Sequence, residues 1–597
     1  MKILDIHEFI PNSYNKKNHN ILWNSRLFKK NKNYYSIYSL INKKSIKLKK
    51  DVNNIYKNFF LRNRLYFYPF FNLKNDFSFL VLSNFVEKNP YKNNFNLHLL
   101  KCLAFKDFIK TNKFNKFNVL SDNKNFNYLI SNLIRADSKY EKKFYLIYNY
   151  LKLSKFFIKN LIQFALFLLK NINFNNKINN KINKNPIFFS FFSYTDKQKA
   201  MSGVYQSEYW KGFSNTSNKN WVHLYDFSSN FKTSQEVRKV IKNLNLNNQQ
   251  KNHFFLDDYL NIKVFIKTIL VAIKFFFLTS KLFLSKNFNL ILTNELYLDG
   301  KKNLDFYQEF ISYSAMRNIL YFYQFENFFL KNKINSNIFF TFENQPWEKM
   351  LLYFAKKNKF IKKTYGVIHS SVRFWDLRFV NFLNNKKPIL GYMNPDKILF
   401  NSFFVKKILL QNGYTKDYLQ FSESLRYLSF NNISKKNKIT KKNKKINLLV
   451  VTDYDDHQNK SLLEIVRSFK YNNKYFLYLK NHPLKKLDIK QNNLKIIDKI
   501  DELKNKIDLA IVGNKTAASI DLYYKNFNIL IFLDSDDLDY SPLHKFIDYK
   551  TFSSINELRM LLDIYSSKNK YTFSKYAKKK YFITNKILSG WKKIVRI

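Results

Sequence analysis

The stretch 507–543, IDLAIVGNKTAASIDLYYKNFNILIFLDSDDLDYSPL, decides how the C-terminal part of the chain folds. Residues 507–512 are a short apolar run of the kind that forms a buried strand, and a Gly-Asn pair after it supplies a turn. Residues 516–524 have helical spacing, and residues 528–533 are a second apolar run. The stretch is therefore predicted to be a βαβ unit.

The helix of this unit begins in a turn of small and polar residues, where an anion can bind. Free N–H groups and the helix dipole at such a start favour phosphate. The spacing matches neither the P-loop nor GxGxxG, so an ordinary capped helix start is the alternative interpretation. The candidate phosphate-binding residues are Gly513, Asn514, Thr516 and Ser519.

The composition indicates a large folded chain with an excess of positive charge. Of its 597 residues, 46% are hydrophobic, and the formal net charge is +60. The excess is Lys and comes with abundant Asn, Ile, Phe and Tyr, the residues of A/T-rich codons, so we expect no nucleic-acid partner. An anionic membrane surface is a better partner for such charge.

Cysteine usage and the N-terminus bear on the compartment. The single cysteine, Cys102, excludes internal disulfides and Cys-based metal sites and fits a reducing compartment. The first residues, MKILDIHEFIPNS, lack the apolar core of a signal peptide. We therefore expect a bacterial cytoplasmic protein that uses no metal or cofactor, with a peripheral position on the inner face of the plasma membrane as a further option.

Two long predicted helices, 152–170 and 262–284, each combine a lysine stripe with a wide apolar face. Their longest apolar runs are shorter than the roughly 20 residues that span a bilayer. Such a pattern is typical of a helix lying in a membrane interface. Two helices packed into the domain with solvated lysines are the alternative. In the second helix the stripe consists of Lys263, Lys267, Lys274 and Lys281.

Alternation of strands and helices predicts the fold class. Expected strands lie at 186–194, 221–227, 289–293, 338–342, 363–368 and 396–400, and alternation restarts after residue 445 with strands at 446–452, 475–480 and 494–497. Polar residues follow several of these strands, at the edge where such sheets bind ligands. We predict an α/β protein with two Rossmann-like domains, as in glycosyltransferase-B-type architecture, plus an N-terminal extension and amphipathic helical insertions.

The predicted division of the chain is the following. Residues 1–105 form an N-terminal accessory region, 106–434 a first Rossmann-like domain that carries the helices 152–170 and 262–284, 435–445 a basic linker, and 446–597 a second, nucleotide-binding domain. A last helix is expected at 571–588, packing back on the first domain.

Glu343 directly follows an expected strand and is the candidate catalytic base. A half-buried carboxylate beside an aromatic residue can have a raised pKa that suits a general base. A carboxylate that caps a helix start is the alternative role, and Glu348, after a proline, is the better candidate for that role. Gln345, His369, Ser370 and Arg373 also follow strand ends and are candidates for substrate contacts.

Lys480, His482 and Pro483 follow another strand and could clamp a nucleotide phosphate, with a solvent-facing loop as the alternative. Two acidic runs, 534–537 and 453–457, also follow strands. The first resembles an Asp-x-Asp metal site, but a solvated loop is the favoured interpretation of both, and no metal ligand is predicted.

Several short motifs occur in an order that resembles a known family. They are GVYQSEYWKG, WVHLYDF, FENQPWE, YGVIHSSVRFWDLR, SESLRYL, NHP and GNKTAAS with LDYSPL, spread over residues 185–565. Together they resemble the bacterial surface-carbohydrate biosynthesis proteins of Leptospira and SAR11 type, which are linked to O-antigen polysaccharides. The resemblance implies a glycosyltransferase-B-like fold and a role in polysaccharide or lipopolysaccharide assembly.

The dipeptide His482-Pro483, which precedes a helix start with Ser and Thr residues, also resembles a motif of bacterial sialyltransferases and capsule-type Kdo transferases. That resemblance implies a CMP-activated donor, with His482 at the phosphate, Thr516 and Ser519 supporting it, and Glu343 as the acidic residue. Asn481 and Lys515 depart from those enzymes, and so does the lack of an acidic pair followed by Gly near Glu343.

The leading hypothesis is a metal-independent glycosyltransferase that moves a sugar from a nucleotide donor to a glycan or lipid-linked acceptor. One alternative is a nucleotide-sugar epimerase, which uses the same kind of cleft between two domains. A second is a non-catalytic partner in polysaccharide assembly or export. Product analysis with and without acceptor separates the first two, and binding without turnover favours the third.

Overall fold

The computed structural model describes residues 2–595, apart from the following positions. These are 12–14, 16, 26–32, 63–70, 91, 93–94, 135–143, 172–181, 214–217, 226–230, 247–251, 285–288, 292–296, 300–303, 382, 384–390, 431–444, 483–484, 486, 488, 504–505, 535–536, 568–571 and 575–579. The predicted basic linker 435–445 lies outside the described residues except for Lys445.

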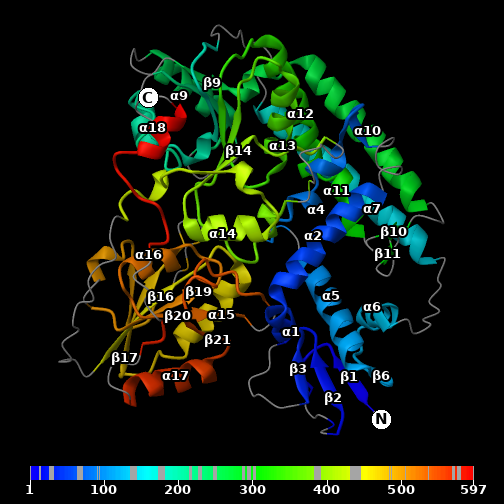
Figure 1. Ribbon diagram of the computed structural model, residues 1–597, viewed down its shortest axis with the longest axis vertical. Helices are drawn as coiled ribbons and strands as arrows, with labels where there is room; N and C mark the ends of the chain where they lie inside the picture. The colour runs from blue at the N-terminus through cyan, green and yellow to red at the C-terminus, as the bar shows by residue number, and fades with distance from the viewer. Residues whose placement is uncertain are drawn as a thin grey trace.

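Two parallel sheets organise most of the chain, so the predicted pair of Rossmann-like α/β domains is confirmed (Figure 1). The first sheet has seven strands in the order β15-β14-β13-β12-β7-β8-β9, all parallel. Its strands are β7 (Ile187–Phe191), β8 (Asn220–Leu224), β9 (His253–Phe255), β12 (Ile338–Thr341), β13 (Thr364–Val367), β14 (Lys397–Phe400) and β15 (Leu419–Phe421). The strand order reverses direction at β7, which places a topological switch point between β7 and β12.

The second sheet has six parallel strands in the order β18-β17-β16-β19-β20-β21. They are β16 (Ile446–Val451), β17 (Tyr475–Lys480), β18 (Leu494–Ile497), β19 (Leu509–Gly513), β20 (Ile529–Phe532) and β21 (Lys550–Phe552). Helix α15 (Asp456–Arg467) connects β16 to β17, α16 (Ala518–Tyr524) connects β19 to β20, and α17 (Ile555–Ser567) follows β21. The stretch 507–543 thus forms the β19-α16-β20 unit at the centre of this sheet.

The N-terminal region is a third α/β unit with a small parallel sheet, β3-β2-β1-β6. Its strands are β1 (Ile3–His7), β2 (His19–Leu22), β3 (Tyr34–Ser36) and β6 (Lys116–Leu120), and its helices are α1 (Ile37–Lys43), α2 (Ser45–Arg62), α4 (Asn84–Glu87), α5 (Phe95–Asn112) and α6 (Lys124–Ile134). The boundary predicted at residue 105 falls inside α5, and β6 pairs with β1. Residues 106–134 therefore belong to this unit and not to the first Rossmann-like domain.

Helices of the first domain cover its sheet and extend beyond it. They are α7 (Phe144–Asn171), α8 (Lys197–Met201), α9 (Ser234–Leu246), α10 (Ile262–Leu284), α11 (Leu304–Ile311), α12 (Tyr313–Lys331), α13 (Pro346–Lys357) and α14 (Phe403–Gln411). α12 is largely buried and packs between α13 and α10, so α10 lies in an outer layer (Figure 1). A strand is present within the expected range 289–293, but among the described residues β10 (Asn289–Ile291) pairs with β11 (Tyr297–Asp299) and is not part of the main sheet.

The C-terminal segment crosses back to the first domain, as Figure 1 shows in red. The helix expected at 571–588 is wrong where the structure describes it, since residues 580–588 form turns and bends. The returning helix is α18 (Ser589–Val595), whose Trp591 joins the core beneath the first sheet. The carboxylate of Glu423 accepts hydrogen bonds from the N–H groups of Gly590 (2.9 Å) and Trp591 (3.2 Å) and so caps this helix.

Two buried histidines lie side by side on adjacent strands of the first sheet. His223 Nε2 and His253 Nδ1 are 2.9 Å apart, and the two rings are parallel. Burial lowers the pKa of His253 to about 3, and burial and the neighbouring histidine hold the pKa of His223 well below its usual value. Both side chains are therefore neutral in the folded protein at pH values where the unfolded chain binds protons.

This pair should make the protein less stable in mild acid. The folded-state pKa values are depressed, so stability is fully present above about pH 6.5 and falls below it, by about 1.4 kcal/mol per pH unit for each histidine. Urea unfolding between pH 7.5 and 5 should show this slope, and His253→Asn should reduce it. His457→Gln, at an exposed histidine, is the control. An unchanged slope in His253→Asn would contradict the assignment.

Candidate functional site

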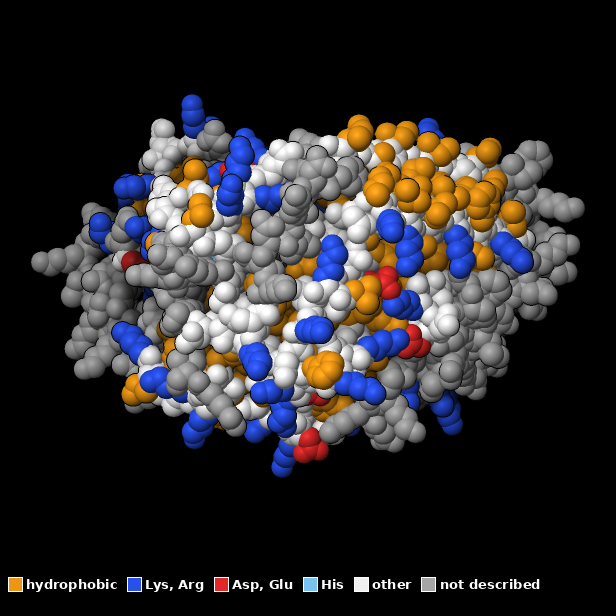
Figure 2. Space-filling view, turned by 90° about the horizontal axis from the view of Figure 1, so that it is seen from above, with side chains coloured by type: hydrophobic (Ala, Val, Ile, Leu, Met, Phe, Trp, Pro, Cys, Tyr) orange, Lys and Arg blue, Asp and Glu red, His pale blue; other side chains and the backbone are white. Residues whose placement is uncertain are grey.

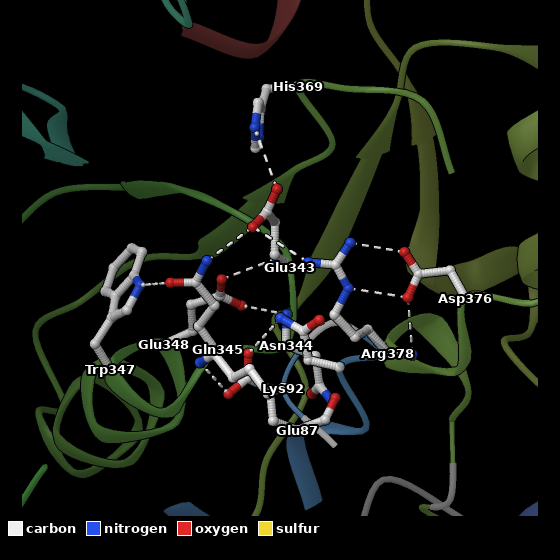
Figure 3. Close-up of polar contacts among 11 residues, drawn as sticks. Glu87, Lys92, Glu343, Asn344, Gln345, Trp347, Glu348, His369, Asp376 and Arg378 are labelled. Atoms are coloured by element: carbon white, nitrogen blue, oxygen red, sulfur yellow. Dashed lines mark hydrogen bonds and ion pairs between the residues drawn. The ribbon is translucent and has the colours of Figure 1, made fainter. Parts of the chain in front are cut away.

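The loop after β12 holds Glu343 at the carboxyl end of the first sheet (Figure 3). Asn344 adopts a left-handed conformation with φ 63°. The buried carboxylate of Glu348 in α13 accepts the N–H groups of Glu343 and Asn344, each at 2.8 Å. Burial raises the pKa of Glu348 to about 8, against the pull of Lys349. Glu348 therefore binds the loop before α13, not the free N–H groups of the helix itself, and it fixes the backbone from which Glu343 projects.

The Glu343 side chain lies at the centre of a polar cluster. Its Oε1 is 3.4 Å from His369 Nε2, and its Oε2 is 3.4 Å from Arg378 Nη1. Gln345 donates to Oε2 at 2.7 Å and accepts from Trp347 Nε1 at 2.8 Å. The structure therefore brings together three predicted residues from two motifs, Glu343 and Gln345 from one and His369 from the other (Figure 3).

The expected raised pKa of Glu343 is wrong in direction. Burial favours the neutral acid, but the nearby Arg378 and His369 outweigh it, and the pKa of Glu343 lies below its usual value of 4.5. The carboxyl group is thus ionised at neutral pH. It can accept a proton, with less driving force than a base of raised pKa would have.

His369 contacts Glu343 as a neutral imidazole. Burial lowers the pKa of His369 to about 4, although Glu343 acts to raise it. The Nε2 atom faces the carboxylate, which favours the tautomer with its proton there. The Tyr209 ring packs against the imidazole at a tilt of 35° with centroids 4.0 Å apart, and Nδ1 is buried without a hydrogen-bond partner among the described residues. The Glu343 carboxylate therefore orients the ring.

Sequence reasoning missed three members of this cluster, which are Arg378, Asp376 and Tyr209. Arg378 is held by Asp376 through two hydrogen bonds, Nε to Oδ1 at 2.9 Å and Nη2 to Oδ2 at 2.7 Å. This fork keeps the guanidinium in the plane that contacts Glu343. The third is Tyr209, in the loop after α8. The Asp-x-Arg spacing within the quoted motif YGVIHSSVRFWDLR was the available signal for Arg378, and the signal for Tyr209 was its place in the quoted motif GVYQSEYWKG.

The turn before α16 in the second domain is already well supplied with protein partners. The N–H of Asn514 donates to Gln458 Oε1 at 2.9 Å, and the N–H of Lys515 donates to Asp453 Oδ2 at 2.6 Å. Ser519 is fully buried and donates to the carbonyl of Thr516 at 3.1 Å. Part of the predicted phosphate site is therefore occupied by side chains from α15 and the end of β16.

Lys515 neutralises part of the two acidic runs. Its Nζ lies 2.6 Å from Asp455 and 2.7 Å from Asp537. Burial opposes its charge, but Asp537 and Asp455 raise the pKa of Lys515 above its usual value. These aspartates serve as partners of a lysine, and no group of three His, Cys, Asp or Glu side chains in the described part of the chain is placed to hold a metal ion.

His482 is half-buried at the end of β17. Its N–H donates to Thr452 Oγ1 at 2.8 Å, and its ring meets the Tyr454 ring edge-on at 5.7 Å. Burial, and then Lys480, lower the pKa of His482. Its neighbour Pro483 lies outside the described residues. His482 is thus held at the strand end that the sequence predicted for it.

One contact joins the strand ends of the two domains. Arg373, in the loop after β13, donates from Nη2 to the backbone carbonyl of Lys515 at 2.6 Å. This loop also carries His369, and Ser370 accepts a hydrogen bond from Asn401 Nδ2 at 3.2 Å through its carbonyl. The first-domain cluster and the turn before α16 are therefore parts of one interdomain region.

Comparison with known proteins gives structural similarity only. No protein-family model and no curated protein matches the chain. Among solved structures, HepE of Anabaena with UDP and glucose is 9% identical, covering 69% of this chain and 95% of its own, with a TM-score of 0.31. The glycosyltransferase SnogD of Streptomyces nogalater is 9% identical, with 64% and 91% covered and a TM-score of 0.30. A UDP-N-acetylglucosamine 2-epimerase is 8% identical, with 69% and 90% covered and a TM-score of 0.31.

Proposed function

We propose that the protein is a glycosyltransferase that moves a sugar from a nucleotide-sugar donor to a surface glycan. The observation that carries this proposal is the Arg373–Lys515 contact. This contact links the loop that carries His369, which lies beside the ionised Glu343, to the polar strand-end turn of the other domain. Sugar transfer by direct displacement uses that combination, because a base takes the proton of the attacking hydroxyl while the leaving phosphate of the donor is bound separately.

In this proposal Glu343 accepts the proton of the attacking sugar hydroxyl. His369 and Arg378 hold the carboxylate in place, and Gln345 and Ser370 are candidates for acceptor contacts. The donor binds at the second domain, where Lys480 and His482 contact the leaving phosphate beside the turn 513–519, whose N–H groups at Asn514 and Lys515 already have protein partners. The reaction, as proposed, needs no metal, since cationic side chains and N–H groups stabilise the leaving group.

The finer assignments rest on the motif resemblance described above. They are an acceptor of the polysaccharide or lipopolysaccharide type, an O-antigen-related pathway, and a CMP-activated donor as one option. An acceptor of this type is carried on a lipid, so the enzyme would work at the inner face of the plasma membrane.

A ligand panel tests the proposal. The purified protein is incubated with CMP-, UDP-, GDP- and dTDP-sugars, and its melting temperature is measured, because a bound ligand stabilises the folded state by mass action. We expect one nucleotide class to raise the melting temperature. Conversion of that donor only with acceptor supports transfer, conversion without acceptor indicates an epimerase, and binding without turnover indicates an assembly partner.

His482→Ala should weaken nucleotide binding with little loss of stability. The side chain is half-buried at a strand end, and its structural hydrogen bond uses the backbone N–H, which the substitution keeps. A hydrogen bond to a charged phosphate contributes about 1.5–3 kcal/mol, so affinity should fall about tenfold or more. Calorimetry measures it, with His457→Gln as an exposed control in the same domain. Unchanged nucleotide affinity removes His482 from the site.

A further inference from the structure

The outer face of α7 and α10 exposes an apolar patch that no described part of the chain covers. On α10 the exposed residues are Ile262, Ile266, Leu270, Ile273, Phe277 and Leu284; on α7 they are Leu151, Ile158, Ile162, Leu166 and Leu169. The exposed fraction reaches 64% at Phe277 and 83% at Leu169. Figure 2 shows a contiguous apolar patch with a row of basic side chains along one border. A monomeric protein rarely exposes an apolar surface of this kind without a partner.

The lysines of α10 border its apolar face. At about 100° per residue, the exposed apolar residues of α10 occupy an arc of about 80°, and the four stripe lysines fall within the next 60° or so. The other side of the helix is buried, with Val264, Ala272 and Phe275 in the core. The helices are also held to each other, since Phe157 of α7 stacks on Phe276 of α10 at 4.4 Å. Of the two interpretations of this helix, packing into the domain fits its buried side. The exposed side remains open to a membrane surface.

The positive charge of the α7–α10 face favours a negatively charged partner. Neither α7 nor α10 contains an Asp or Glu residue, while both carry several lysines. Of the four stripe lysines of α10, only Lys267 contacts a carboxylate among the described residues, at 3.4 Å from Glu326. A second copy of the chain seated on this face would oppose lysine to lysine, whereas an anionic lipid surface offers negative headgroups beside hydrocarbon.

We propose that the α7–α10 face docks on an anionic lipid bilayer, with the apolar arc in the interface and the lysine row against the headgroups. None of the described helices is long and apolar enough to cross a membrane. The contact is therefore peripheral. Binding of this face to lipid requires no turnover, so it can be tested independently of the sugar-transfer proposal.

Co-sedimentation with lipid vesicles tests the docking surface. The parent protein should bind vesicles that contain phosphatidylglycerol, bind neutral phosphatidylcholine vesicles far less, and be released by high salt. Each basic residue at an anionic surface is worth about fivefold in binding, so Lys263, Lys267, Lys274 and Lys281 changed to Gln should lower binding by roughly 10²- to 10³-fold. The matched control changes Lys470, Lys474, Lys495 and Lys499 of the second domain to Gln and should lose much less.

A second set of variants tests the apolar arc. Ile266→Asn, Leu270→Asn and Phe277→Asn together should abolish vesicle binding, whereas Tyr471→Asn, Met560→Asn and Ile587→Asn, at equally exposed positions elsewhere, should preserve it. Melting temperatures should stay close to the parent value, because all six side chains are exposed. Equal binding to neutral and anionic vesicles, or equal loss in both lysine sets, would overturn the proposal. So would a parent protein that binds no vesicles and forms a dimer that Leu270→Asn disrupts.

Discussion

Glu343→Gln is expected to lower turnover by about 10²- to 10⁴-fold, the usual contribution of a positioned general base. The amide keeps the shape of the side chain and removes its ability to take a proton. The fold should tolerate the change, since Arg378 keeps both hydrogen bonds to Asp376 and the loop stays fixed by Glu348. Donor affinity and melting temperature should therefore remain close to the parent values.

The matched control is Glu208→Gln, an exposed glutamate of the same domain. It should leave turnover unchanged. If Glu343 is only structural, its variant will instead show a lower melting temperature, with turnover reduced in proportion to the folded fraction. That outcome would exclude Glu343 as the base.

The pH dependence of the parent enzyme gives a second readout for Glu343. Burial acts to raise its pKa, but Arg378 and His369 outweigh it and hold the pKa below 4.5. With Glu343 as the base, kcat/KM should stay on its plateau as the pH falls from 7 to about 5 and decline only as the carboxylate is protonated. A decline centred near pH 6 to 7 would point to another group.

Trp591→Ala is expected to lower the free energy of unfolding by about 3–5 kcal/mol, the usual cost of truncating a fully buried tryptophan. The side chain is 0% exposed, and its ring meets that of Phe213 edge-on at 4.9 Å. Its Nε1 donates to the carbonyl of Glu423 at 2.8 Å, and this acceptor would lose its partner. The loss should appear in the unfolding transition of the first domain, measured by urea denaturation.

Lys592→Ala, on the exposed side of the same helix, is the control and should change stability by less than about 0.5 kcal/mol. Trp591→Phe should fall between the two, because it keeps most of the packing and loses the hydrogen bond. A loss below about 1 kcal/mol in Trp591→Ala would mean that the C-terminal helix is not a working part of the first domain's core.

Local patterns predicted the elements with strong periodicity well. The helix 262–284 and the strands 475–480 and 494–497 have the predicted bounds in the structure. Their apolar residues repeat with the period of the element, and this information is contained within the segment itself. The N-terminal sheet was not predicted, because its strands are short and its pairing joins distant segments, as β6 (Lys116–Leu120) does with β1.

The individual candidate residues could be predicted from the sequence, but their contacts and pKa values could not. Strand-end position was enough to single out Glu343, His369, Arg373 and His482. The pKa of Glu343 is depressed because Arg378 reaches it from a later loop. The direction of this pKa shift could therefore not be predicted from the sequence neighbours of Glu343. The pairing of Lys515 with Asp455 and Asp537 likewise joins three separate loops.

The sequence by itself determined that the chain is an α/β protein with two Rossmann-like domains, because each strand and helix carries its own periodicity. The tertiary structure alone decided which loops meet, which helix faces stay open, and where the C-terminus packs. The lysine-striped helices illustrate the difference: their pattern is compatible with burial or with a membrane. In the tertiary structure α12 packs against one side of α10, and the opposite arc of α10 stays exposed. Periodicity is a property of one segment, whereas exposure and pKa depend on neighbours brought close by strand order.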